Sequence, residues 1–466
     1  MSAPLLVLFA ASWTSAVSTT AENPWFAPPS DPGLRPEAEM TVDLSKTDQT
    51  MIGFGTAVSE LSWGALSLLS AADRAAVLDE LFKPGDGAGF TYVRTPIGAS
   101  DFAFDYYSYD DHPGDFGQEK FSLEIDERAL LPLLREIKSR VPAESFVLWA
   151  SPWCPPRWMK KSGAYASRPP YTDALPTNDC TWAGWYTYGE DAFKCDSRHF
   201  GAYAKYFRKY VDAMRAKGLP VNMVMPQNEP NSCQPYPSCT WRGRSLADFT
   251  VNYLGPALEG SGAEIYIGTI EERSTEKVHD VFEQPNGNRY VTGAGFQWEG
   301  RGSIGAIHRR YPDLTLIMSE HECNDGKNDW AGFLHSWDVA RTFIGQGAQA
   351  YDYWNLALTD EQKSRWGWPQ NSLVTVDRTT RKARYNLEYS FMKQMARHVR
   401  RGAKRLLTRG DLDELGFLNP DGSVVLMFAN RGSEPRAIAV VLAGERLVAT
   451  LPAASLSTFV RTPGKR

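Results

Sequence analysis

The sequence predicts an α/β protein, a (β/α)8 TIM barrel with a small antiparallel β-sandwich beside it. From about residue 51 the chain alternates apolar, strand-like runs with amphipathic, helix-like segments. This alternation is typical of a parallel sheet covered by helices. Eight such units fit before about residue 400, and beyond it short strand-like runs follow one another without helices. Strand-like runs that follow one another without helices indicate antiparallel pairing.

The expected barrel strands are apolar runs that stop at Gly, Pro or polar residues. They cover residues 51–61, 90–102, 145–158, 221–231, 263–272, 290–300, 314–323 and 348–358. Ser70 and Asp73 have the spacing of an N-cap for the helix after the first strand. Gly218 and Pro220 predict the end of the helix before the fourth strand. Gly53 and Gly55 are expected to let neighbouring backbones approach closely.

Five segments are predicted along the chain. They are a signal peptide at 1–20, a Pro-rich linker at 21–37, sandwich strands at 38–50, the catalytic barrel at 51–400 and the C-terminal sandwich at 401–466. The first segment is an apolar run followed by small residues, although it lacks a basic start, so we expect an exported or secreted protein. No later run is long and apolar enough for a transmembrane segment.

The amino-acid composition narrows the classes of molecule that we expect the protein to bind. The net charge is -5 and the pI is about 5.9, which argues against nucleic acid. The chain has 15 Trp and 20 Tyr, of which we expect a minority to stack on sugar rings and the rest to pack in the core. No metal or cofactor motif is visible, so neither is predicted. The oligomeric state is left open.

The six cysteines fit an exported protein with disulfides. The two pairs that lie close together in loop-like sequence are predicted to form bridges: Cys180 with Cys195, and Cys233 with Cys239. Cys154 and Cys323 each follow a strand and are expected to be buried thiols.

Two of the expected strands end in acid. The fourth, in MVMPQNEPN, ends at Asn228 and Glu229, and the seventh, in LTLIMSEHEC, ends at Glu320 and Glu322. In an α/β barrel the carboxyl ends of the strands form the catalytic face. Two facing carboxyl groups are the requirement for glycoside hydrolysis, and retaining enzymes hold them about 5 to 5.5 Å apart. The pattern therefore favours a carbohydrate-cleaving enzyme.

We assign Glu229 as the acid/base and Glu320 as the nucleophile. Glu320 lies closer to the apolar run than Glu322, but residues two apart on a strand face the same way, so Glu322 stays open as the alternative. His321 is expected to be a packed residue with no catalytic role.

Several stretches resemble glycoside hydrolase family 30 of clan A, and most of all its glucosylceramidase-type members. They follow the family's order over about residues 50–466: GFGTAVSE (53–60), VRTPIGASDF (93–102), LWASPWCPPRWMK (148–160), PQNEPN (226–231), MSEHEC (318–323), YWNLAL (353–358) and the C-terminal NPDGSVVLMFANR. The resemblance implies a sandwich built from both chain ends and a retaining mechanism, with Glu229 as acid/base and Glu320 as nucleophile.

The resemblance also implies the residues around the two carboxylates. We expect substrate-binding roles for five residues: Asp101, Trp153, Asn228, Trp298 and Trp354. Arg94 is expected beside the nucleophile, where its charge would keep Glu320 ionised, with Glu299 and Glu322 close by.

The chain departs from the family pattern after the sixth strand. Gln297, Trp298 and Glu299 stand where glucosylceramidases carry His-Trp-Tyr. An acid in place of the tyrosine is expected to change what lies beside the nucleophile, so ceramide is not supported as the natural aglycone.

Three hypotheses about function result. The first is a retaining β-glycosidase acting on β-glucosides or related β-linked sugars. The second is a polymer-cleaving glycanase of the same family, acting on β-1,6-glucan, β-1,6-galactan or xylan. The third is a non-catalytic carbohydrate-binding barrel, against which the presence of both carboxylates argues. The sequence leaves the sugar and the linkage open.

Overall fold

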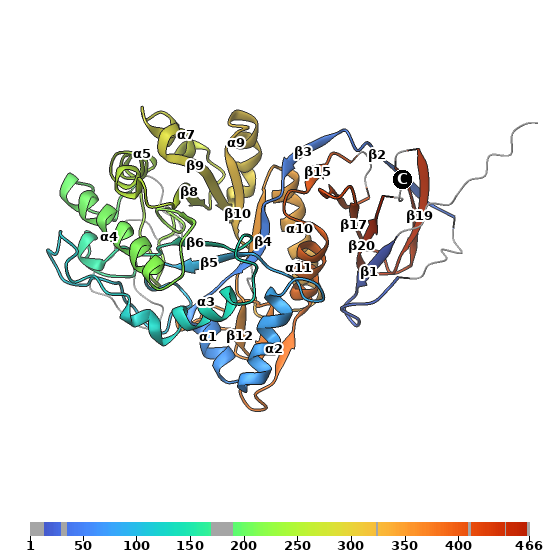
Figure 1. Cartoon of the computed structure of the whole chain (residues 1–466), viewed down its shortest axis with the longest axis horizontal. Helices are drawn as coiled ribbons and strands as arrows, with labels where there is room; N and C mark the ends of the chain where they lie inside the picture. Colours follow the sequence, from blue (N-terminus) through green and yellow to red (C-terminus); the bar gives the residue numbers. More distant parts are fainter. Residues whose placement is uncertain are drawn as a thin grey trace, which may run out of the picture.

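The computed structural model of the chain describes residues 14–28, 35–168, 190–322, 325–408, 412–442 and 444–463. A closed barrel of parallel strands lies beside a β-sandwich, and a small three-stranded sheet projects from the barrel (Figure 1). The predicted fold class is therefore confirmed. Within the described residues, no helix has the length and apolar character needed to cross a bilayer.

The barrel closes in the strand order β4 to β11, and each strand lies within one of the eight predicted runs. The strands are β4 (Gly53–Ala57), β5 (Tyr92–Pro96), β6 (Val147–Ser151), β7 (Met223–Val224), β8 (Glu264–Ile270), β9 (Val291–Gln297), β10 (Thr315–Glu320) and β11 (Ala350–Tyr353). A Cβ at Gly55 would lie 1.5 Å from the carbonyl oxygen of Tyr92, so only glycine allows β4 to approach β5 this closely.

Buried side chains fill the barrel, so it is a packed core and not a pore. This inner layer comprises Tyr92, Trp149, Met223, Met225, Tyr266, Ile317 and Ala350. The members of this layer nearest the carboxyl ends of the strands lie directly beneath the side chains that follow the strands. Those side chains therefore pack on a rigid layer.

Helices surround the barrel. They are α1 (Glu60–Ser67), α2 (Ala71–Phe82), α3 (Leu130–Lys138), α4 (Ser197–Ala216), α5 (Gly243–Asp248), α6 (Gly255–Leu258), α7 (Glu276–Phe282), α8 (Gly287–Tyr290), α9 (Ile304–Arg310), α10 (Trp330–Gly345) and α11 (Leu387–His398), with short turns η1 (Glu124–Arg128), η2 (Arg157–Met159), η3 (Phe249–Leu254) and η4 (Trp298–Gly302). As predicted, Ser70 Oγ accepts a hydrogen bond from the Asp73 amide at 3.0 Å and caps α2. Gly218, with φ +77°, follows the end of α4.

The sandwich packs a six-stranded sheet, in the order β1-β20-β17-β16-β15-β3, against a three-stranded sheet, β19-β18-β2. The strands are β1 (Ser15–Thr19), β2 (Ala38–Val42), β3 (Thr47–Thr50), β15 (Lys404–Leu406), β16 (Glu414–Leu418), β17 (Val424–Asn430), β18 (Arg436–Leu442), β19 (Glu445–Leu451) and β20 (Ser455–Arg461). Both chain ends contribute strands, as expected. Most pairs are antiparallel, but β2 runs parallel to β18.

One boundary differs from the sequence analysis. Residues 15–19, which we assigned to a signal peptide, form β1 and pair with β20 along their whole length. Ser18 Oγ lies 2.7 Å from Ser457 Oγ inside this sheet. This part of the expected leader therefore belongs to the folded sandwich. A leader and export stay predictions, because residues 1–13 lie outside the described residues.

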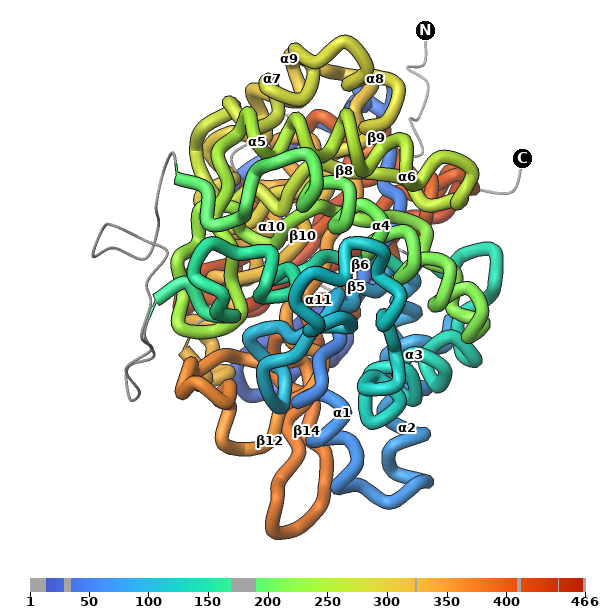
Figure 2. Tube along the Cα trace, turned by 90° about the vertical axis from the view of Figure 1, so that its left-hand side faces the viewer, coloured from blue at the N-terminus to red at the C-terminus, as the bar shows by residue number. Residues whose placement is uncertain are grey.

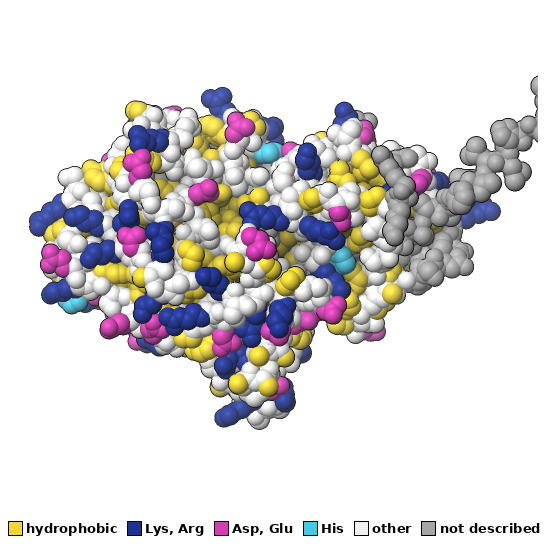
Figure 3. Space-filling model, viewed as in Figure 1, with side chains coloured by type: hydrophobic (Ala, Val, Ile, Leu, Met, Phe, Trp, Pro, Cys, Tyr) yellow, Lys and Arg dark blue, Asp and Glu magenta, His cyan; other side chains and the backbone are white. Residues whose placement is uncertain are grey.

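Helices α10 and α11 connect the barrel to the sandwich. On α11, Gln394 Nε2 donates to Thr19 Oγ1 at 2.7 Å. Asp338 of α10 pairs with Arg431 of the sandwich at 2.5 Å. Acidic and basic side chains also lie interspersed over the face of the molecule in Figure 3. The two domains are thus joined by buried polar contacts and by surface ion pairs.

An additional sheet interrupts the last βα unit. It consists of β12 (Ala357–Thr359), β13 (Val374–Val376) and β14 (Ala383–Tyr385), and it lies against α1 (Figure 2). The loop between β12 and β13 returns to the mouth of the barrel. The sequence analysis did not anticipate this sheet.

Neither predicted disulfide is present. Cys195 has a free, exposed thiol, and Cys180 lies outside the described residues. Cys239 is not bridged to Cys233; its thiol donates to the carbonyl oxygen of Thr240 at 3.9 Å. Proximity in sequence was the wrong criterion, because Cys233 is disulfide-bonded but not to Cys239, whose thiol forms no bridge. Cys154 is a buried thiol, as expected, and Cys323 lies outside the described residues.

Candidate active site

A cavity of about 200 Å³ lies at the carboxyl ends of the barrel strands. It is lined by Asp101, Trp153, Asn228, Glu229, Gln234, Tyr236, Trp298, Glu320, Trp368 and Gln370. Six of these were selected from the sequence, including both candidate catalytic glutamates. The structure thus brings together residues that lie more than two hundred positions apart in the chain.

Glu320 is the last residue of β10 and forms a buried ion pair with Arg94. Arg94 Nη1 donates to Glu320 Oε2 at 2.5 Å, and the arginine side chain is fully buried. Burial raises the pKa of Glu320 to about 7, although the Arg94 guanidinium acts in the opposite direction. Of the two glutamates in the cavity, Glu320 is the one whose ionised form receives a direct cationic partner.

Arg94, on β5, is itself fixed from several sides. Its Nη2 donates to Asn228 Oδ1 at 2.6 Å and to Ser151 Oγ at 2.9 Å. Its Cζ lies 4.4 Å from the ring centroid of Trp153 and 4.8 Å from that of Trp149. Cation–π contacts of this kind are strongest where water is excluded. Arg94 therefore sets the positions of Glu320 and of Asn228 together.

Glu229 follows β7 in an unusual backbone conformation. Its φ is +47°, a left-handed value that is uncommon for a non-glycine residue and occurs often at functional sites. Its amide donates to Thr269 Oγ1 at 3.1 Å. Burial raises the pKa of Glu229, and the Gln297 amide opposes this rise. A carboxyl group with a raised pKa is suited to act as a general acid.

A buried clamp holds the chain two residues beyond Glu229. The Asn231 amide donates to Glu271 Oε1 at 2.6 Å. Lys277 Nζ donates to Asn231 Oδ1 at 2.7 Å and to Glu272 Oε1 at 2.6 Å. Burial raises the pKa of Glu271 to about 8, although Lys277 acts in the opposite direction. These contacts fix the turn that carries the strained Glu229.

Glu271 and Glu272 were not among the residues expected in the site. Their sequence carries a sign of their position, because AEIYIGTIEE ends in two acids at the carboxyl end of a strand, as the two strands with the catalytic candidates do. The acids were read only as the end of the fifth strand.

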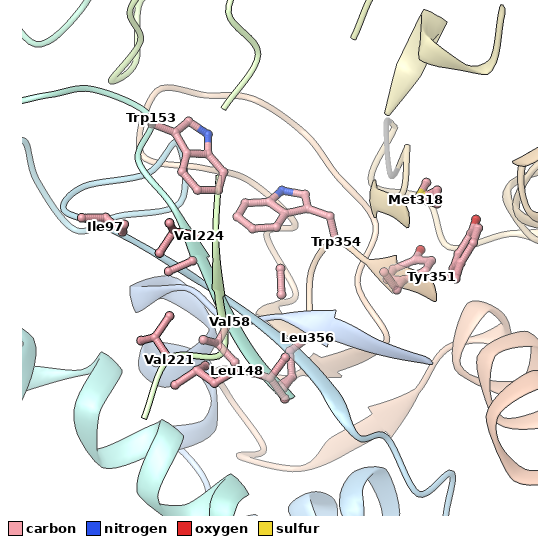
Figure 4. Close-up of a cluster of buried hydrophobic side chains, with 14 of the residues drawn as sticks. Val58, Ile97, Leu148, Trp153, Val221, Val224, Met318, Tyr351, Trp354 and Leu356 are labelled. Atoms are coloured by element: carbon pink, nitrogen blue, oxygen red, sulfur yellow. The ribbon is translucent and has the colours of Figure 1, made fainter. Parts of the chain in front are cut away.

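Two indole rings form one wall of the site. The ring centroids of Trp153 and Trp354 lie 5.4 Å apart at an interplanar angle of 30°, and Phe102 meets Trp354 edge-on (Figure 4). Trp153 lines the cavity, whereas Trp354 is 1% exposed and packs behind it. Trp153 is therefore the ring that a sugar can reach, and Trp354 supports it.

Asp101 lines the same cavity as Glu229 and Glu320. Burial, together with the Glu320 and Glu229 carboxylates, raises the pKa of Asp101 well above its ordinary value. Within the described residues, Asp101 Oδ1 has no hydrogen-bond partner. A buried polar atom without a partner is costly unless a ligand satisfies it, so this oxygen is suited to receive a sugar hydroxyl.

Glu299 does not lie where the sequence analysis expected it. Its carboxylate pairs with Arg273 at 2.5 Å and with Arg301 at 2.9 Å, and it contacts neither catalytic candidate. Arg301 also pairs with Glu322 at 3.2 Å, and Glu322 pairs with His335 at 3.0 Å. The acid thus belongs to an ion-pair network at the rim, because two arginines near it attract the carboxylate outward.

Glu322 belongs to the same network and does not line the cavity. His321 is buried, its amide donates to the Asp352 carbonyl at 2.9 Å and its ring stacks on Tyr353, so it is a packed residue as expected. Of the two alternatives for the nucleophile, only Glu320 reaches the cavity.

Four lining residues were missed. Gln234 and Tyr236 come from the loop after β7, and Trp368 and Gln370 come from the loop between β12 and β13. Loops at the carboxyl ends of barrel strands carry function, and the aromatic, Pro-containing sequence WGWPQ was a visible sign. Their approach to the cavity depends on the inserted sheet, which the sequence pattern did not predict.

Within the described ranges, no group of three or more His, Cys, Asp or Glu side chains is arranged to hold a metal ion.

Comparisons with known proteins agree with this architecture. The model of the glycosyl hydrolase family 30 TIM-barrel domain matches residues 51–365, and that of the glycosyl hydrolase family 30 beta sandwich domain matches residues 402–459. The endo-1,6-beta-D-glucanase BGN16.3 of Trichoderma harzianum is 26% identical over 88% of this chain and 84% of its own length. The lysosomal acid glucosylceramidase of Mus musculus is 24% identical over 85% of this chain and 78% of its own.

Solved structures share the whole fold. SrfJ from Salmonella typhimurium superimposes with a TM-score of 0.81 at 24% identity, covering 96% of this chain and 100% of the other. The endo-beta1,6-glucanase BT3312 has a TM-score of 0.80 at 24% identity, covering 96% and 99%. From the two family models, which together match most of its length, the chain belongs to glycoside hydrolase family 30.

Proposed function

We propose that the protein is a retaining β-glycosidase that cleaves β-linked glucosyl units, with Glu320 as nucleophile and Glu229 as acid/base. One observation carries the assignment. The two strand-end glutamates line the same small cavity, and only Glu320 has a guanidinium in direct contact. Of two coupled buried carboxyls, the one with the cation ionises first, so the proton stays on the other.

The reaction then has two steps. Glu320 attacks the anomeric carbon while Glu229 gives its proton to the glycosidic oxygen, so the bond to the leaving group breaks and a glycosyl ester forms on Glu320. In the second step Glu229, now a carboxylate, takes a proton from water. The water oxygen attacks the anomeric carbon and releases Glu320, and the sugar leaves with its original β configuration.

Short carboxyl separation is the requirement for this route. Gln297 supports it, because its Nε2 lies 3.1 Å from Glu229 Oε1 and the residue is the register partner of Glu320 on the neighbouring strand β10. A residue that contacts the first glutamate and lies beside the second in the sheet is consistent with two carboxyl groups that are close to one another.

The surrounding residues fit a glucosyl ring. Asp101 and Asn228 present oxygens for hydroxyl groups, and the face of Trp153 is available for stacking. Asn228 stands beside the acid/base and is held by Arg94, so it is placed to bond a hydroxyl near the reacting carbon.

A polymer-cleaving activity on β-1,6-glucan is the second candidate. Two observations favour it over ceramide glycosides. Among the relatives, a fungal endo-1,6-beta-D-glucanase matches 88% of the chain. The aromatic and amide side chains of Trp368, Tyr236, Gln234 and Gln370 extend the cavity with surfaces typical of sugar binding.

A covalent trap tests the proposal. A 2-deoxy-2-fluoro β-glucoside with a good leaving group should inactivate the enzyme and add one fluoroglucosyl mass to the peptide containing Glu320. The Glu322→Gln variant is the matched control and should be labelled as the wild type is. Labelling on any other acid, or no labelling of an enzyme that turns over β-glucosides, would contradict the assignment. Product analysis on β-1,6-glucan, gentiobiose and glucosylceramide then separates the two candidates.

A further inference from the structure

Gln297 lies where β9 ends, between the two catalytic glutamates, and its side chain is fully buried. Its Nε2 lies 3.1 Å from Glu229 Oε1 and 3.5 Å from Asn228 Oδ1. Glu320 is the register partner of Gln297 on the neighbouring strand β10, and the Gln297 amide lowers the pKa of Glu320. A neutral amide thus occupies the position that contacts Glu229 and lies beside Glu320.

The orientation of this amide is determined by a chain of contacts. Arg94 can only donate, so the Asn228 atom 2.6 Å from it is the oxygen Oδ1. Thr269 Oγ1 donates to the same oxygen at 3.1 Å. At the other end, Ser319 Oγ lies 3.0 Å from Gln297 Oε1. If the amide were reversed, its oxygen would face the oxygens of Asn228 and Glu229. Nε2 therefore points to Glu229.

This orientation has a chemical consequence. An amide N–H group donates and cannot accept, so the Glu229 proton cannot point to Gln297, and the carbonyl oxygen of the acid is the better acceptor of this bond. In the neutral form of Glu229 that oxygen is Oε1, and the proton resides on Oε2. When Glu229 gives up its proton, the same N–H group remains bonded to the resulting carboxylate.

We propose that Gln297 is a positioning residue whose amide keeps the acid proton on Oε2 of Glu229, beside Glu320. The inference deepens the proposed function and rests on it. It concerns a residue that this chain does not share with the His-Trp-Tyr pattern of glucosylceramidases, so it predicts a behaviour particular to this protein.

The charged groups around the two carboxyls define what a pH experiment measures. Arg94 from β5, Asp101 from the loop after β5 and Glu271 from the end of β8 act on them electrostatically. These three residues are unchanged in the variants below, so a shift of the pH profile is due to the replacement of the Gln297 amide.

Gln297→Met removes the donor while keeping a similar length, and Gln297→Glu keeps the shape while replacing the donor nitrogen by an acceptor oxygen. Loss of a donor to an ionised group raises both carboxyl pKa values, so both limbs of the pH profile of kcat/KM should move to higher pH. The rate on substrates with poor leaving groups should fall about ten- to hundredfold, as expected for a lost charge-assisted hydrogen bond. Gln297→Glu should move both limbs further.

Gln394→Met is the control, because Gln394 is also a buried amide but lies on α11, bonded to Thr19 of the sandwich. Its pH limbs should match those of the wild type. Unchanged limbs in both Gln297 variants, with only a lower plateau, would overturn the proposal and leave Gln297 a packing residue.

A second measurement separates this inference from the proposed function. Glutamate δ-carbons labelled with ¹³C report carboxyl titration without turnover, with Glu229→Gln and Glu320→Gln used for assignment. Higher titration midpoints for both glutamates in Gln297→Met support the inference, and unchanged midpoints contradict it. A wild type that hydrolyses no β-glycoside would contradict the proposed function alone, since the titration is read independently.

Discussion

The guanidinium of Arg94 on β5 and the carboxylate of Glu320 on β10 lie 2.5 Å apart, with side-chain exposures of 0% and 7%. Breaking a buried pair by removing one partner leaves an uncompensated charge, which typically costs about 3 to 5 kcal/mol. The pair therefore links the folding stability of the barrel mouth to the ionisation of the nucleophile.

Arg94→Met tests this link. Without the guanidinium the pKa of Glu320 should rise further, so the acidic limb of kcat/KM should move to higher pH, and the rate should fall by about a hundredfold or more. Stability should fall at pH 8, where Glu320 must ionise, and much less at pH 5, where it can stay protonated. A pH profile with parallel thermal melts measures both. An unchanged acidic limb would show that Arg94 does not control the nucleophile.

Glu320→Gln removes the nucleophile with almost no change of shape. Turnover of aryl β-glucosides should fall to background, while the circular dichroism spectrum stays that of the wild type. Glu322→Gln is the matched variant and should keep most of its activity, because Glu322 pairs with Arg301 and His335 outside the cavity. The reverse result would move the nucleophile to Glu322.

Glu229→Ala should distinguish substrates by their leaving groups. A nitrophenolate leaves without protonation, so activated aryl glucosides should be hydrolysed far better than unactivated disaccharides. Azide should restore the rate with the activated substrate and yield the β-glucosyl azide, because azide, unlike water, needs no base to remove a proton. Equal losses on both substrate types would remove Glu229 from the acid/base role.

The meeting of these two glutamates in one cavity could be predicted from the sequence, because each follows an apolar run whose carboxyl end lies on the same face of the barrel. Arg94 and Trp153 were expected there from the resemblance to family 30, and the structure places both beside Glu320 or in the cavity. The eight strand runs also determined the closure of the barrel, because their order along the chain is their order in space.

Other features depend on contacts that no local pattern reveals. The small residues at 15–19 have the composition that ends a leader, yet β20 provides a partner edge for them, 437 residues or more away. The carboxylate of Glu299 turns outward because Arg273 and Arg301 meet there in the folded chain. Trp368 reaches the cavity only because β12 and β13 pair. No local sequence pattern marks any of these contacts.

Glu271→Gln should stabilise the protein at alkaline pH. Burial raises the pKa of Glu271 to about 8 from an unfolded value of 4.5. Between these values the folded state holds a proton that the unfolded state has lost, so stability decreases as pH rises, by roughly 1.4 kcal/mol per pH unit. Glutamine can still accept the bond from the Asn231 amide but carries no such penalty.

The variant should therefore match the wild type near pH 4.5 and unfold at a higher denaturant concentration at pH 8 to 9. Denaturant melts across this range provide the measurement. Glu272→Gln is the contrasting variant, because Glu272 pairs with Lys277 and its loss should destabilise the clamp. A pH-independent difference between Glu271→Gln and the wild type would contradict a buried, protonated Glu271.

The stereochemistry of hydrolysis tests the central claim most directly. An aryl β-glucoside is hydrolysed in an NMR tube, and the anomeric proton of the first glucose released is recorded before mutarotation. The two-glutamate double displacement predicts that β-glucose appears first and the α-anomer accumulates only later. Initial release of α-glucose would contradict it, because it requires a single displacement by water between carboxyl groups that are held further apart.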